Sequence, residues 1–408
     1  MSETVRIKDI QVILTAPNGI RLVVVKVLTD QPGLYGLGCA TFTQRALTVA
    51  SAINDYLRPF AIGWDVDRIE DFYQAAYVSS YWRSGPVLNN ALSGVDQALW
   101  DIKGKRAGMP LYQLFGGKCR EAVPVYTHAH GHDEHELAEN AAAIMERGFR
   151  YVRVQMSVPG LSTYGSLSPV TAQALNRNQT RTWEPTPYVR RVPAMLDFLR
   201  NKLGEDVELL HDVHERIPPI QGVWLAKAVE PYRLFFLEDL FAPEDISYFR
   251  MVREQTSTPL AMGELFVNQA EYVPLMRDQL IDFIRVHISD IGGLSMARKL
   301  AAFGEFLGIR TAFHGPGDVS PVGHAANMHL DLAISNFGIQ ELALFPEETK
   351  AVFPGCPEVR DGALWANDKP GLGIDVDEKL AAQYPFPEDA INGAWPEIRR
   401  LDGTVIKP

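Results

Sequence analysis

Between Val123 and Glu341 the sequence alternates short β-rich runs with amphipathic helical stretches. This alternation is typical of parallel strands joined by helical crossovers. The runs are VPVYTH, YVRVQ, VELLHD, FFLED, PLAMGE, DFIRVH, IRTAFH and GIQE. So many units within roughly two hundred residues, with no Gly-rich phosphate turn after the first run, favour a (β/α)₈ TIM-like barrel over an open sheet.

Helical periodicity separates these runs, and one connection lacks it. Helices are expected near 134–147, 189–203, 219–229, 245–254, 269–277 and 295–307. The segment 156–188 is instead rich in Ser, Thr, Pro and Gly. A loop of that length is commonly functional, and after a barrel strand it would cover the mouth where barrel active sites lie. We therefore predict an active-site lid over 156–188.

The two ends of the chain predict a second unit. Residues 5–29 alternate apolar and polar positions around the turn Pro17-Asn18-Gly19, and helical periodicity follows from Thr43 to Asp101. Strands followed by helices predict an α+β arrangement. After Phe353 the sequence is rich in turns. We expect an α+β capping domain over 1–120 on which 354–408 packs back, and a barrel domain over 121–353.

Composition excludes several classes of partner. The net charge of -11 at pH 7 argues against binding to nucleic acid or an anionic membrane surface, because both require a basic patch. No apolar run is long enough to span a bilayer. Three cysteines in no pairing pattern predict reduced thiols, and the charged start does not resemble a signal peptide. We expect a cytoplasmic protein.

Three carboxylates stand at the ends of three successive predicted strands. They are Asp212, Glu238 and Glu264, and each is 26 residues from the next. One βα unit per carboxylate would place all three at the same barrel mouth. Oxygen ligands of this kind suit a hard divalent cation, Mg²⁺ above all, with Mn²⁺ as the alternative. A single strand-end acid is more simply a helix N-cap, but three in register favour a metal site.

Histidines form a second group at the same predicted mouth. His128 and His314 end the first and seventh runs, and His214 lies two residues after Asp212, on the same strand face. Imidazole is the usual proton shuttle near neutral pH. Asp290, at the end of VHISD, would hydrogen-bond His314 and fix its tautomer. Structural roles remain open for each histidine taken alone.

A third group joins Arg153, in YVRVQ, to Tyr164 in the predicted lid. A guanidinium beside a phenol stabilises the phenolate and would make Tyr164 a base. The alternative, which the residues alone favour, pairs Arg153 with a barrel acid and leaves Tyr164 to pack.

Several longer motifs resemble the enolase superfamily, and within it the mannonate dehydratase subgroup, starvation-sensing protein-like members included. The resemblance covers essentially the whole chain. It is carried by RVQ-x-x-VPG, Tyr164-Gly165, HDVHE, LEDLFAPED, GELF, HISDIGG, HGPGDVSPVGHAANMHLDLAI and NFGIQE. The chain departs from the subgroup's pattern at Met156-Ser157 and at Thr43-Gln44-Arg45, positions that shape substrate fit.

The resemblance implies specific roles. Asp212, Glu238 and Glu264 would bind the metal ion, Arg153 with Tyr164 would form the base, and His214 would be the acid. The substrate-binding residues would be His128, Arg285, Asp290, His314, Asp318 and Glu341. It also implies a homo-oligomer, an octamer or a tetramer.

The implied reaction is dehydration of an acid sugar, with D-mannonate the leading substrate and D-gluconate next. Tyr164 would take the proton at C2 while Mg²⁺ binds the carboxylate, and His214 would protonate the departing C3 hydroxyl, giving a 2-keto-3-deoxy sugar acid. Two alternatives stay open. One is a mandelate racemase-like racemase or epimerase that uses His314, and the other is a regulatory homologue of low or no activity.

Overall fold

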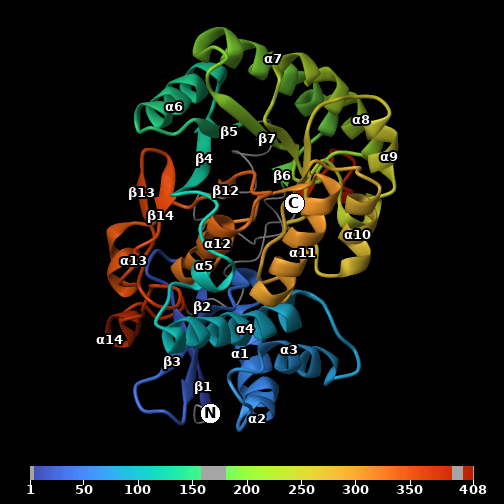
Figure 1. The fold of residues 1–408 in the computed structure, drawn as a ribbon. Helices are drawn as coiled ribbons and strands as arrows, with labels where there is room; N and C mark the ends of the chain where they lie inside the picture. The colour runs from blue at the N-terminus through green and yellow to red at the C-terminus, as the bar shows by residue number, and fades with distance from the viewer. Residues whose placement is uncertain (1–3, 158–180, 388–397, 408) are drawn as a thin grey trace.

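The structure is a computed structural model, and it describes residues 4–157, 181–387 and 398–407. Two layers of structure are distinguished in Figure 1, where a small sheet with its helices lies below a ring of strands and helices. Tyr164 and most of the predicted lid lie outside the described residues.

The lower unit is built on an antiparallel sheet of order β1-β2-β3. Its strands are β1 (Ile7–Thr15), β2 (Leu22–Thr29) and β3 (Tyr35–Cys39), and its helices are α1 (Ala46–Ser51), α2 (Arg58–Ala61), α3 (Ile69–Val78), α4 (Pro86–Ala107) and α5 (Leu111–Leu114). Helix α4 packs so closely on β3 that a Cβ at Gly38 would lie 2.0 Å from the Gly94 carbonyl oxygen. The α+β cap predicted from the sequence is present.

The upper unit is the predicted barrel. Its parallel strands are β4 (Val123–Gly131), β5 (Tyr151–Met156), β7 (Glu208–Asp212), β8 (Phe236–Glu238), β9 (Leu260–Met262), β10 (Phe283–Ile284), β11 (Arg310–Thr311) and β12 (Gln340–Glu341). From β4 to β11, each strand pairs with the next one named. A bridge between Thr311 and Phe337 joins β11 to the residues just before β12, and β12 pairs with β4. The ring is therefore closed, and side chains such as Tyr126, Leu210 and Phe236 fill its interior.

Helices follow the strands around the outside of the ring (Figure 1). They are α6 (Glu134–Glu146), α7 (Pro185–Leu203), α8 (Pro219–Ala228), α9 (Tyr248–Arg253), α10 (Gln269–Arg277), α11 (Leu294–Leu307), α12 (Pro321–Ala333) and α13 (Glu347–Val352). Helix α7 starts at Pro185, so the last residues of the predicted lid segment are helical. Proline suits this first turn, because the N–H that it lacks would have no helical partner there.

Several strands are shorter than the sequence pattern predicts. DFIRVH contributes only Phe283–Ile284, and IRTAFH only Arg310–Thr311. The backbone nevertheless stays in contact beyond the ladder, because the His314 N–H donates to the Val286 carbonyl over 3.1 Å. His314 and Asp290 therefore lie on segments that leave the sheet, rather than at strand ends.

The C-terminal part contacts both units. The hairpin of β13 (Glu358–Arg360) and β14 (Ala363–Trp365) pairs with the start of β4. Farther along, the region of α14 (Glu378–Ala381) reaches the cap, where Thr15 Oγ1 donates to the Ala381 carbonyl over 2.9 Å. Finally β15 (Ile398–Arg399) pairs with β6 (Arg181–Thr182) and with β16 (Val405–Ile406).

Buried polar contacts tie the cap to the tail. The Asp101 carboxylate on α4 accepts hydrogen bonds from the Leu37 N–H at 2.9 Å and from the Leu372 N–H at 2.8 Å. Lys105, one turn along α4, donates to the same carboxylate over 2.7 Å. Asp101 thus fixes α4 against both β3 and the tail.

Two further observations concern the chain as a whole. None of the helices in the described ranges is long and apolar enough to cross a membrane. Cys39, Cys119 and Cys356 are free thiols, as their irregular spacing predicts.

Candidate active site

A cavity of about 670 Å³ opens where the barrel strands end. The cap contributes Thr41, Phe42, Gln44 and Arg45 to its wall. The barrel contributes His128, His130, Arg153, His214, Glu215, Glu264, Leu265, His287, Asp290, His314, Pro316 and Asp318. The predicted histidines, with Glu264, Asp290 and Asp318, therefore meet at the carboxyl-terminal side of the strands, opposite a wall supplied by the cap. This is the usual position of a barrel active site.

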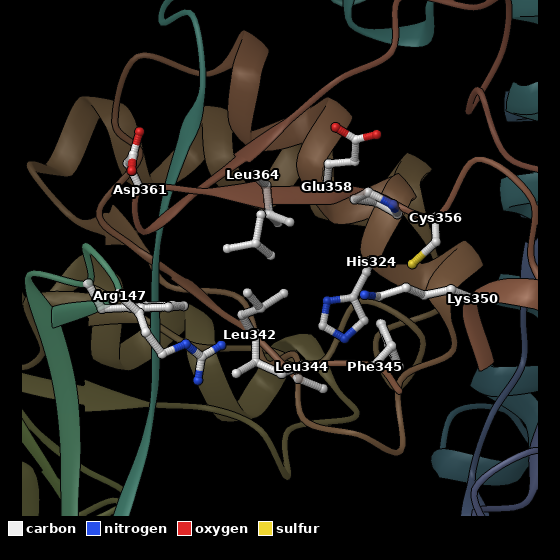
Figure 2. A pocket seen from close by; sticks show the side chains of 14 residues that line it. Arg147, His324, Leu342, Leu344, Phe345, Lys350, Cys356, Glu358, Asp361 and Leu364 are labelled. Carbon is white, nitrogen blue, oxygen red and sulfur yellow. The ribbon is translucent and has the colours of Figure 1, made fainter. Parts of the chain in front are cut away.

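A second cavity, of about 570 Å³, lies elsewhere (Figure 2). Its walls come from the end of α6, from α12 and from the segment between β12 and β14, and they include His324, Lys350 and Cys356. It shares no lining residue with the cavity at the barrel mouth, and none of the predicted site residues lines it. The candidate active site is therefore the cavity at the barrel mouth.

A cluster of buried carboxylates forms an acidic floor beneath the cavity, and of its members only Glu264 lines the cavity wall. Asp212 and Glu238 are the last residues of the adjacent strands β7 and β8, and with Asp239 they bring one oxygen each within 4.8 Å of one another. Glu264 lies two residues beyond β9, outside this group, and lines the cavity. Asp239 was not predicted, although the paired acids of LEDLF were a visible signal. Its φ of 42° turns its carboxylate inward, a backbone conformation that Asp tolerates better than most residues.

Two buried arginines bind these carboxylates, and one of them, Arg153, also lines the cavity. Arg285 contacts Glu264 and Glu341, and its Nη2 lies 3.0 Å from Glu238 Oε1. Arg153 donates to the same Glu238 oxygen over 2.7 Å, with Asp212 at 3.5 Å. The pairing of Arg153 with a barrel acid, one of the two alternatives for this residue, is therefore present.

The charges of this cluster do not balance. Among the described residues, five buried carboxylates (Asp212, Glu238, Asp239, Glu264 and Glu341) surround two buried guanidinium groups (Arg153 and Arg285). Burial, with Asp212 and Glu341 nearby, raises the pKa of Glu238 well above its ordinary value despite both arginines. Burial and the neighbouring carboxylates also raise the pKa of Asp239. Burial and crowding thus make these acids take up protons, and a bound cation would instead hold their oxygens ionised.

The donor atoms fit a divalent cation. Asp239 Oδ2 is buried and has no hydrogen-bond partner among the described residues. Carboxylate oxygens are the preferred ligands of Mg²⁺ and Mn²⁺. Glu264 differs electrostatically, because His314 and Arg285 together overcome its burial and hold its pKa well below the ordinary value. Glu264 is therefore ionised and faces the cavity.

The predicted histidines reach this acidic floor. His128 Nε2 lies 2.8 Å from Glu341 Oε1, and burial lowers the pKa of His128. His214 Nε2 and His314 Nε2 each lie 3.4 Å from an oxygen of Glu264. The strand argument for His214 was wrong, because β7 ends at Asp212 and His214 has a φ of 54°. A left-handed turn, rather than strand periodicity, brings its ring to the cavity.

The predicted hydrogen bond between Asp290 and His314 is not found. Asp290 Oδ1 instead accepts from Asn90 of α4, while His314 Nδ1 lies 2.8 Å from His287 Nδ1. Asp290 lies too far beyond the end of β10, at Ile284, to be the partner of His314. His287 was not among the predicted residues, although it ends the run DFIRVH just as His314 ends IRTAFH.

The remaining predicted substrate contacts divide into two groups. Asp318 lines the cavity, and burial raises its pKa. Arg285 and Glu341, like the predicted metal ligands Asp212 and Glu238, do not line it, since all four are buried beneath the cavity. The position of Arg285 and Glu341 indicates that they support the acidic cluster.

Comparisons with known proteins agree with this architecture. Residues 1–116 match the family model of the mandelate racemase / muconate lactonizing enzyme N-terminal domain, and residues 136–380 match that of the enolase C-terminal domain-like family. The chain belongs to the enolase superfamily. Its similarity extends to the D-galactonate dehydratase family, whose member RspA from Pantoea ananatis is 54% identical over 98% of this chain and 99% of that protein. A member from Salmonella enteritidis is 53% identical, covering 99% of each chain.

Solved structures of the superfamily have the same fold. An enolase from Pantoea ananatis, crystallised with bound D-gluconate and Mg, superposes with a TM-score of 0.93 at 52% identity, covering 99% of this chain and 100% of that one. A mandelate racemase/muconate lactonizing enzyme from Sulfitobacter sp. superposes with a TM-score of 0.83 at 26% identity, covering 97% and 99%.

Replacing Arg285 tests whether the buried guanidinium holds the acidic floor. Arg285→Met should lower the free energy of unfolding by about 3–5 kcal/mol, because it leaves buried carboxylates without their partner. The measurement is urea unfolding in the presence of EDTA. The matched control is Arg250→Met. The Arg250 side chain is 61% exposed and pairs with Asp278, so its loss should change the free energy of unfolding by less than about 1 kcal/mol. Equal effects of the two substitutions would contradict the assignment.

Proposed function

We propose that this protein is a Mg²⁺-dependent acid-sugar dehydratase. The proposal is carried by the similarity of this chain, over its whole length, to the enolase from Pantoea ananatis that was crystallised with D-gluconate and Mg. The barrel-mouth cavity supports it, since it combines an acidic floor with histidines and a wall from the cap. The product would be a 2-keto-3-deoxy sugar acid.

Asp212, Glu238 and Glu264 would hold the cation in this proposal, with Mn²⁺ as the possible substitute for Mg²⁺. When bound, the cation would offset the negative charge that develops on the substrate carboxylate as the neighbouring C–H proton leaves. To bind the cation, Glu264 would have to give up part of its contact with Arg285. Its lowered pKa and its position in the cavity wall support its assignment as a ligand. Asp239 is the competing third ligand.

The chain's own residues would move the protons. Tyr164, which lies outside the described residues, would remove the C2 proton, with Arg153 stabilising its phenolate. Arg153 lines the cavity beside His128, so its guanidinium is accessible to a group that enters the cavity. His214 would protonate the leaving C3 hydroxyl, and His128, His314, Asp318 and Asp290 would contact the sugar chain.

The substrate is the finer part of the proposal. We expect D-mannonate first and D-gluconate next. Both carry the carboxylate and the adjacent C–H that the reaction requires. The cap residues Gln44 and Arg45 lie in the cavity wall, where they would contact the hydroxyls that distinguish one acid sugar from another.

A substrate screen tests this function. Purified protein with Mg²⁺ should convert D-mannonate or D-gluconate to a 2-keto-3-deoxy product, and EDTA should abolish turnover until Mg²⁺ is restored. The assay detects the 2-keto acid, and loss of water separates dehydration from inversion at C2. An inert protein that still binds Mg²⁺ would overturn the dehydratase proposal in favour of a regulatory homologue, and inversion at C2 would favour a racemase or epimerase.

The third metal ligand is tested by two substitutions that each remove one charge. Glu264→Gln should weaken Mg²⁺ binding about tenfold or more, whereas Asp239→Asn should change it much less. Calorimetric titration of the metal-free protein with Mg²⁺ measures both. The reverse order would assign Asp239 in place of Glu264.

The base is tested by Tyr164→Phe, which removes one hydroxyl. Turnover should fall by about 10²–10⁴-fold, as for loss of a general base, while the affinity for Mg²⁺ stays unchanged. Tyr112→Phe is the matched control, because that hydroxyl binds Asp368 in the cap region, away from the cavity. Full activity of the Tyr164 variant would assign proton removal to another residue.

Two other expectations from the sequence remain predictions. One is assembly into a homo-oligomer, an octamer or a tetramer, and the other is a cytoplasmic location. Light scattering of the purified protein would establish the first.

A further inference from the structure

His287 and His314 occupy equivalent positions on neighbouring segments, three residues beyond β10 and three beyond β11. Their Nδ1 atoms are 2.8 Å apart, and the ring centroids are separated by 4.9 Å. The backbones are joined by the hydrogen bond from His314 to Val286. Both side chains line the barrel-mouth cavity, so the pair belongs to the candidate site.

We propose that His287 is a positioning residue that holds the ring of His314 with its Nε2–H directed at Glu264 and the substrate. His314 then acts as a hydrogen-bond donor to an oxygen of the acid sugar, and not as a base. The inference rests on the proposed function for the class of substrate, and the orientation of the ring is independent of it.

The positions of the protons follow from the contacts. Two ring nitrogens 2.8 Å apart require one N–H and one lone pair between them. His314 Nε2 lies 3.4 Å from an oxygen of the Glu264 carboxylate, whose lone pairs would repel a lone pair on the nitrogen, so this nitrogen carries hydrogen. A neutral His314 then has its lone pair on Nδ1, which accepts the Nδ1–H of His287.

The second nitrogen of His287 agrees with this arrangement. His287 Nε2 is buried and has no hydrogen-bond partner among the described residues. With the hydrogen on Nδ1, Nε2 carries only a lone pair. The opposite tautomer would bury an unpaired N–H, an arrangement that folded proteins rarely contain.

A histidine partner has a different consequence from a carboxylate partner. A carboxylate only accepts, so it would place the hydrogen of a neutral His314 on Nδ1 and leave Nε2 as a base, as in a catalytic triad. The carboxylate predicted as the partner, Asp290, is instead held by Asn90, and its backbone carbonyl accepts from Asn89. Helix α4 of the cap therefore removes the carboxylate, and His287 takes its place. This arrangement disfavours the racemase-like alternative.

The rival explanation is that His287 only fills space, and two substitutions separate the roles. His287→Leu removes both nitrogens and keeps most of the volume. His287→Asn places an amide N–H near the position of Nδ1 and is the conservative variant. Binding of D-gluconate to the Mg²⁺-loaded protein, measured by calorimetry alongside kcat and KM, should weaken about tenfold in the Leu variant and recover in the Asn variant.

A double-mutant cycle decides whether His287 acts through His314. In a His314→Asn background, His287→Leu should have little further effect on binding, because the oriented donor is already lost. A space-filling role predicts that the loss persists in that background and that Asn does not restore binding, and either result would overturn the inference. His329→Leu serves as the control, since this buried histidine accepts from the Tyr112 N–H outside the cavity and should affect stability alone.

Failure of the proposed function can be distinguished from failure of the positioning role of His287. If the wild-type protein neither binds nor converts any acid sugar, the proposed function falls, and the ring orientation is then tested by a crystal structure of His287→Leu. A rotated His314 ring would support the positioning role, and an unchanged ring would overturn it.

Discussion

The barrel mouth is organised by buried guanidinium groups among an excess of buried carboxylates. Arg285 has no exposed surface, and it contacts Glu238, Glu264 and Glu341, which come from three different strand ends. Such a cluster is costly to bury, and it persists only when each charge has partners. The acids that remain in excess give the site a preference for a cation, whereas the same residues without the arginines would repel one another.

This cluster separates supporting residues from contacting residues. Glu341 and Arg285 lie beneath the floor, while Glu264, His214 and His314 face the cavity. The two layers act together on ionisation, because His314 in the cavity wall and Arg285 beneath it both lower the pKa of Glu264 against the effect of its burial. Roles assigned by motif alone do not distinguish the two layers, because both carry the same residue types at strand ends.

The cap contributes more than a wall. Helix α4 packs against β3 through glycines, is fixed by Asp101, and sends Asn89 and Asn90 to the Asp290 segment of the barrel. The interaction that determines which partner His314 has therefore originates in the cap. A change in α4 would affect the candidate site through Asp290, although no residue of α4 lines the cavity.

The pattern of the sequence was sufficient to predict the barrel and to place the candidate carboxylates and histidines near its mouth. Periodicity is local, and a carboxylate or histidine after a buried run must lie near the mouth once the strands are parallel. The sequence could not show where each strand ends. The strand-based arguments for His214 and for the Asp290–His314 hydrogen bond were therefore wrong. The sequence pattern also missed Asp239 and His287, because left-handed turns and contacts between segments orient those side chains. Only tertiary structure decides such contacts, since they depend on atoms brought together from distant parts of the chain.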